Sequence, residues 1–87
     1  MNKMKAVTWI DWRHDDDVCG EAAMIATPDK FLDLVVTPID RGAVWDVIDG
    51  VDRIASDQAD SVEEAKRKAE TEARRALFRI VKKHTDR

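Results

Sequence analysis

One long amphipathic pattern near the C-terminal end limits the fold of this chain more than any other feature. Ser61-Val62-Glu63-Glu64 has the form of a capping box, in which the serine hydroxyl accepts the Glu64 N–H and the Glu64 carboxylate accepts the Ser61 N–H. Small and apolar residues then recur at steps of three and four, the spacing of one helix face. They are Val62, Ala65, Ala69, Ala73, Ala76, Leu77 and Ile80. The pattern predicts one helix over about residues 61–84.

The residues before this helix have the composition of strands, with apolar, β-branched and aromatic runs separated by turn residues. The runs are residues 5–13, 22–27, 31–39, 43–48 and 51–56. Between the last two, Asp49-Gly50 predicts a two-residue type I′ hairpin loop, which would place Asp46 opposite Arg53 and Trp45 opposite Ile54. We therefore predict a single α+β domain over residues 1–87. Its antiparallel meander of four to five short strands, about 5–56, would have the long C-terminal helix packed on one face.

One helix covers only one face of such a sheet, yet two of the predicted strands are apolar on both faces. Trp9 and Trp12 differ in parity, and Leu32 alternates with Phe31 and Val35. We expect the open face to bind either a second copy of the chain, as a homodimer, or a different protein, with Trp9 or Trp12 at the contact. Two alternatives remain: a curled sheet whose loops cover these residues, and a structural protein that binds only itself.

The net charge of −3 is unevenly distributed along the chain. Residues 1–61 hold six Lys and Arg against thirteen Asp and Glu, a net charge of −7, whereas residues 62–87 hold nine against five, a net charge of +4. The acidic run Asp15-Asp16-Asp17 could face a basic groove on a protein partner. Opposite the alanine stripe, arginines around Phe78 could instead hold phosphates and stack a base. Because the chain is acidic overall, we expect a protein partner before a nucleic acid. The candidate partner-binding residues are Trp12, Asp15, Asp16, Asp17, Arg74, Arg75 and Phe78.

No residue pattern in the chain indicates catalysis. The three glycines stand singly, there is no tyrosine, and no serine lies in a nucleophile elbow. A chain of 87 residues also has little volume for a closed pocket. We therefore predict no enzymatic activity and no cofactor. His14 beside the three aspartates lacks the ligand spacing of a metal site, so we expect a solvated acidic turn there.

Cysteine usage and hydropathy give expectations about the compartment. Cys19 is the one cysteine, so the chain forms no internal disulfide, and we expect its thiol to be buried or half-buried as a small apolar group. No apolar run approaches the roughly 20 residues of a membrane span. The first residues also lack the apolar core of a signal peptide, because Asp11 interrupts it. These features predict a cytoplasmic protein without a membrane partner.

The chain resembles two groups of bacterial and phage proteins. Ser61-Val62-Glu63-Glu64-Ala65, after several strands and before an alanine-rich helix, is similar to HicB-type antitoxins, whose fold is related to double-stranded-RNA-binding domains. In its size, acidity and single domain, the chain also resembles small phage and prophage inhibitors, anti-CRISPR proteins among them. The second resemblance implies the function that we predict first: a non-enzymatic protein-binding inhibitor of a bacterial defence complex, acting by surface occlusion. The first implies the alternative, a nucleic-acid-associated regulator of the antitoxin type.

Overall fold

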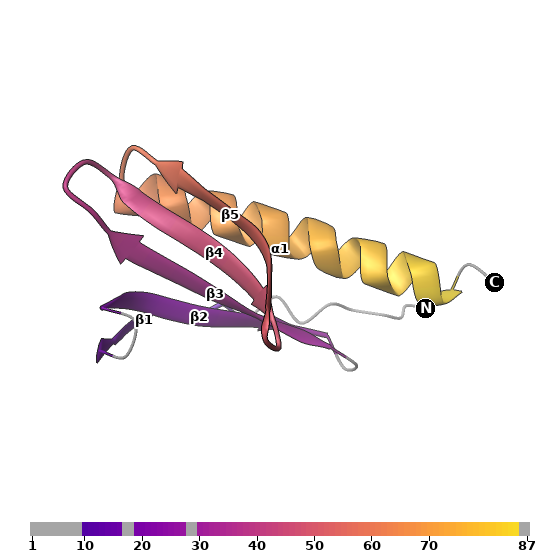
Figure 1. Ribbon diagram of the computed structural model, residues 1–87. Helices are drawn as coiled ribbons and strands as arrows, with labels where there is room; N and C mark the ends of the chain where they lie inside the picture. Colours follow the sequence, from indigo (N-terminus) through magenta and orange to yellow (C-terminus); the bar gives the residue numbers. More distant parts are fainter. Residues whose placement is uncertain (1–9, 17–18, 28–29, 86–87) are drawn as a thin grey trace.

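The fold is a five-stranded antiparallel sheet with one helix across one face (Figure 1). The computed structural model describes residues 10–16, 19–27 and 30–85, with side chains up to Arg79. In chain order the elements are β1 (Arg13–Asp15), β2 (Gly20–Ala26), β3 (Phe31–Pro38), β4 (Ala43–Asp49), β5 (Asp52–Ala59) and α1 (Val62–Thr85). The strands lie side by side in the same order, each antiparallel to the next. The predicted α+β meander with a C-terminal helix is confirmed.

The core lies between α1 and the sheet face that it covers. Alternate residues of the strands point into it, as the period of a strand requires. The buried strand residues are Ile25, Leu32, Leu34, Val36, Ala43, Trp45, Val47 and Ala59. The helix supplies the predicted stripe, in which Ala65, Ala69 and Ala73 are completely buried and Leu77 nearly so. Small alanine side chains let the helix backbone approach the sheet closely. In the described part of the chain, no helix is long and apolar enough to cross a membrane.

The start of α1 follows the predicted capping box in one of its two bonds. The Glu64 N–H donates to the Ser61 hydroxyl at 3.1 Å, as expected. The Glu64 carboxylate, however, accepts the N–H of Asp60 at 3.2 Å and not that of Ser61. The Glu64 side chain therefore reaches one residue further back than in a standard capping box and bonds to the backbone of Asp60.

The predicted register of the last hairpin is wrong. The loop is Gly50-Val51, because Asp49 pairs with Asp52. Gly50 has a φ of 68°, while Cys19 is the one non-glycine residue of the described ranges with a positive φ. A positive φ at the first loop residue alone fits a type II′ turn and not the expected type I′. The sequence Asp49-Gly50-Val51 is compatible with a type I′ turn at Asp49-Gly50 or a type II′ turn at Gly50-Val51, and the structure has the second.

A β-bulge between Val47 and Ile48 shifts the pairing of β4 and β5 further. Trp45 therefore lies opposite Asp57 and does not face Ile54 as predicted. Trp45 is buried under α1, whereas Ile54 is exposed.

The expected pairing of Asp46 with Arg53 survives only as an ion pair. Arg53 Nε lies 3.1 Å from Asp46 Oδ1 although the two residues are not opposite each other.

The first strand is shorter and later than predicted. Of the expected strand over residues 5–13, residues 5–9, with Trp9, lie outside the described part, and residues 10–12 are not in a strand. The side chain of Trp12 lies on the helix side, where its Nε1–H donates to Glu70 Oε2 at 2.7 Å. Lys66 Nζ lies 5.7 Å from the centroid of the same indole ring. Trp12 therefore fastens the chain before β1 to α1 and does not face away from it.

Cys19 is exposed, so the prediction of a buried or half-buried thiol is wrong. It lies in the turn before β2 with a φ of 54°, and its N–H donates to the Asp16 carbonyl at 3.3 Å. The chain returns to the sheet at Gly20, which is buried and lies so close to β3 that a Cβ there would collide with the Val36 carbonyl oxygen. The tight turn needed to bring Gly20 against β3 leaves the Cys19 side chain in solvent.

Candidate binding surface on the open sheet face

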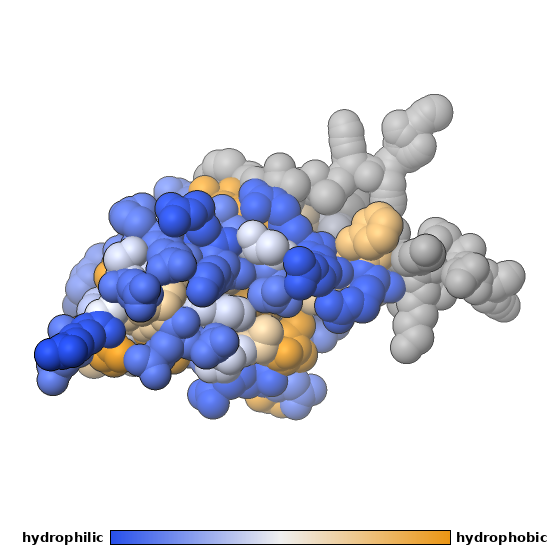
Figure 2. Space-filling view, turned by 90° about the horizontal axis from the view of Figure 1, so that it is seen from above, coloured by the Kyte–Doolittle hydropathy of each residue, from blue (hydrophilic) through white to orange (hydrophobic). Residues whose placement is uncertain are grey.

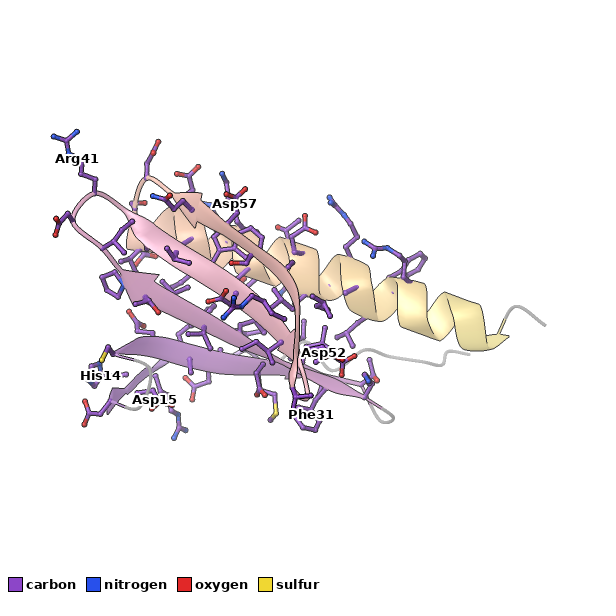
Figure 3. The ribbon with its side chains drawn as sticks, viewed as in Figure 1. His14, Asp15, Phe31, Arg41, Asp52 and Asp57 are labelled. Atoms are coloured by element: carbon purple, nitrogen blue, oxygen red, sulfur yellow. The ribbon has the colours of Figure 1, made fainter. Side chains whose placement is uncertain are left out.

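The sheet surface that faces away from α1 is called the open face here, and the alternate residues of all five strands form it. Figure 3 shows Phe31 and Asp15 on this side, far from the helix. From β1 to β5, the strand register places the following residues on it: Arg13, Asp15, Ala22, Met24, Phe31, Asp33, Val35, Thr37, Val44, Asp46, Ile48, Arg53, Ser56 and Gln58. Many of these side chains are apolar, although no described element covers the face.

The centre of the open face is an apolar patch with a carboxylate in its middle. Asp33 pairs with Met24 of β2 on one side and with Ile48 of β4 on the other. Phe31 and Val35 precede and follow it on the same face of β3. Met24 is 46% exposed and Phe31 51%, while Val35 and Ile48 are half-buried. We call Met24, Phe31, Val35 and Ile48, with Asp33 between them, the central patch.

The charges around the central patch are paired, but Asp33 is not. Arg13 Nε lies 2.9 Å from Asp11 Oδ2, and Arg53 Nε lies 3.1 Å from Asp46 Oδ1. Both arginines that the described strands place on the open face are therefore engaged within the chain. Asp33 forms no ion pair or hydrogen bond with any residue of the described ranges. A half-buried carboxylate among apolar neighbours is unfavourable unless a donor or cation reaches it.

A shallow hollow opens beside Asp33, toward the β1 edge of the sheet. Its walls come from β1, β2, β3 and the residues just before β1. The lining residues are Asp11, Arg13, His14, Asp15, Ala22, Ala23, Met24 and Asp33. The hollow is thus continuous with the central patch and has an excess of carboxylates over cations. Within the described ranges, no three His, Cys, Asp or Glu side chains are arranged to hold a metal ion.

The structure separates the residues that the sequence singled out. Asp15 lines the hollow on the open face. Asp16 lies in the exposed turn, with its Oδ1 2.7 Å from His14 Nε2, and Asp17 lies outside the described residues. Trp12 lies on the helix side, as described above. Of the expected sheet-side contact residues that the structure describes, Asp15 alone therefore adjoins the central patch.

The other predicted candidates lie on the solvent side of α1. Phe78 is 68% exposed, as its position opposite the alanine stripe implied. Arg74 Nη1 lies 3.7 Å from Glu70 Oε1, and Arg75 Nη1 lies 2.8 Å from Glu72 Oε2. These carboxylates offset part of the positive charge of the helix. Toward its C-terminal end α1 extends past the sheet, so this surface is well separated from the central patch (Figure 1).

A second shallow hollow lies where β5 meets α1, and its walls are mostly charged. The lining residues are Trp45, Asp57, Glu64, Arg67, Lys68, Thr71 and Glu72. Glu64 and Lys68, both on α1, form an ion pair in one wall of the hollow at 3.5 Å. The indole N–H of Trp45 is buried nearby without an acceptor. Seen from above, the molecular surface over β5 and α1 is largely hydrophilic (Figure 2). This region lacks the contiguous apolar surface of the open face.

Asp33, Met24 and Ile48 are not among the residues predicted from the sequence to bind a partner. Asp33 interrupts the apolar run of residues 31–36 at a position that shares a face with Phe31 and Val35. This interruption of the apolar run indicates a charged residue on the face that the helix leaves uncovered. The flanking Met24 and Ile48 follow only from the pairing of β3 with its two neighbours.

No protein-family model matches the chain, and the comparisons with curated proteins and with solved structures found no match. Function is therefore inferred from the residues and surfaces of the chain alone.

Proposed function

We propose that this protein is a non-enzymatic protein-binding module that inhibits a bacterial defence complex by covering part of its surface, as small acidic phage proteins do. The central patch on the open face is the observation that supports this proposal. Exposed apolar surface is unfavourable at about 25 cal/mol per Å², and contiguous apolar patches on small domains mark interaction sites. Met24 and Phe31 are each about half exposed there. A partner that covers the patch recovers this free energy.

Both edge strands of the sheet have features that hinder pairing with another strand, which favours binding through the face. At one edge, β5 carries a β-bulge and the charged residues Asp52, Arg53 and Asp57. At the other edge, β1 is only three residues long. Bulges, charges and short edge strands all hinder strand addition. The face, in contrast, carries no comparable protection over its centre.

The chain provides a matched pair of variants for a test, because Phe31 and Phe78 are both exposed phenylalanines on separate surfaces. The tagged wild type, Phe31→Lys and Phe78→Lys would each be used to capture proteins from a bacterial lysate treated with nuclease. We expect the wild type and Phe78→Lys to retain the same protein partner and Phe31→Lys to lose it. Retention of that partner by Phe31→Lys would contradict binding through the central patch.

The alternative function is a nucleic-acid-associated regulator of the antitoxin type, with HicB-like use of the basic helix. The exposure of Phe78 beside Arg74 and Arg75 favours it, because an aromatic ring among arginines can stack a base and hold phosphates. The same capture experiment separates the two functions. The alternative predicts two results. Nuclease treatment removes all material bound to the wild type. Without nuclease, Phe78→Lys fails to capture that material whereas Phe31→Lys still captures it.

A further inference from the structure

We infer that the open face is built for a partner protein that places a Lys or Arg side chain on Asp33, and not for a second copy of this chain. This inference rests on the proposed function, since it specifies the partner for the same surface. It follows from the position of Asp33 in the central patch and from the pairing of the charges around it.

Any partner that covers the central patch also covers Asp33. Met24 and Ile48 flank it across the sheet, and Phe31 and Val35 flank it along β3, so the four apolar side chains cannot be buried while Asp33 stays in water. Removing a carboxylate from water without a compensating charge is strongly unfavourable. A suitable partner must therefore bring a hydrogen-bond donor or a cation to this position, and a cation compensates the charge most fully.

Within the described strands, a second copy of the chain has no unpaired cation to offer there. A face-to-face homodimer presents the same surface from both sides. Among the described strands, that surface has two cations, Arg13 and Arg53, which already pair with Asp11 and Asp46. The second copy would instead add its own Asp33 and Asp15 to the interface. Self-association through this face would bury two unpaired carboxylates, one from each copy.

The surroundings of Asp33 fit a Lys or Arg side chain along its length. The long aliphatic stem of such a side chain packs well on apolar surface while its charged end reaches a carboxylate. Met24, Phe31 and Ile48 supply that surface around Asp33. Arginine suits the site better than lysine, because a guanidinium can form two parallel bonds to one carboxylate.

The inference can be tested without the natural partner by using n-butylguanidinium chloride, which has the stem and the charge of an arginine side chain. Titration into isotopically labelled protein would be followed by amide chemical shifts, with n-butanol as the uncharged control. We expect saturable shifts at Met24, Asp33 and Ile48 with millimolar affinity. Asp33→Asn should weaken this affinity about tenfold, the effect of losing a charged hydrogen-bond partner. Asp57→Asn, an exposed carboxylate on the helix side, should leave it unchanged.

Sedimentation of the wild type at micromolar concentration provides the second readout, and a monomer is expected. The inference is overturned if the wild type forms a dimer that Phe31→Lys dissociates, or if Asp33→Asn binds the guanidinium as well as the wild type does. These failures leave the proposed function intact when Phe31→Lys still loses its captured protein partner. If the proposed function itself is wrong, the wild type and Phe31→Lys will capture the same proteins in equal amounts.

Discussion

The two faces of the sheet come from alternate residues of the same strands, yet they carry different chemistry. In β3, Leu32 and Leu34 are completely buried under α1, whereas Phe31, Asp33 and Val35 lie between them on the open face. The buried residues of the helix face are all apolar, because a polar group there would lose its water. The open face mixes large apolar side chains with an unpaired carboxylate.

This difference shows that the open face is neither a core nor an ordinary solvent surface. The exposed side of an antiparallel sheet is normally polar, and a core carries no unpaired charge. Large apolar residues around a small number of polar groups are typical of the buried centre of a protein interface. The helix face therefore explains how the chain folds, and the open face is the part that folding alone does not explain.

The largest expected effect contrasts two neighbouring residues of β3. Leu34→Ala should lower the free energy of unfolding by about 2–5 kcal/mol, since it removes a completely buried side chain and leaves a cavity. Val35→Ala, on the open face, should lower it by about 0.5 kcal/mol, as for most surface substitutions. Urea denaturation followed by tryptophan fluorescence would measure both. Similar losses for the two variants would mean that the open face is covered in the free protein.

A medium effect is expected at Trp12, which belongs to the helix face. Trp12→Phe removes the hydrogen bond to Glu70 and weakens the interaction with the Lys66 ammonium. It should lower the stability by about 1 kcal/mol. This corresponds to a fall in Tm of about 4–8 °C for a domain of this size. Calorimetry would measure it, with Phe78→Leu as a control that leaves Tm nearly unchanged. If Trp12→Phe kept its Tm but no longer captured the protein partner, Trp12 would belong to the interface. The helix face would then also take part in binding, contrary to the comparison drawn above.

The elements with strong local signals could be predicted from the sequence. The capping residue Ser61 and the alanine stripe determine α1 almost to the residue, because both depend on neighbours within one or two turns. The hairpin register depended instead on which side of Gly50 the loop formed and on a bulge at Val47. Two turn types fit the same three residues, and the observed register places Ala55 and Ala59 on the side of α1.

The open face could be predicted in outline, but its composition could not. One helix and strands that are apolar on both faces were enough to expect an uncovered apolar surface. The expectation that Trp12 could lie on it required the strand to run through residues 5–13, and β1 begins only at Arg13. Trp9, the other predicted contact, lies outside the described residues. The role of Asp33 depended on long-range pairing, which alone brings Met24 and Ile48 beside it.

The smallest expected effect is a gain in stability from removing the one charge of the central patch. Asp33→Val replaces a poor strand residue with a good one and should raise the free energy of unfolding by about 0.5–1 kcal/mol. Urea denaturation at low micromolar concentration would measure it, with Asp33→Asn as a control of nearly equal size that keeps a polar group. The valine also completes an apolar patch, so sedimentation at higher concentration should show self-association that the wild type lacks. A loss of stability in both variants would show that Asp33 stabilises the folded chain, and the open face would then differ from the helix face for reasons of folding rather than of binding.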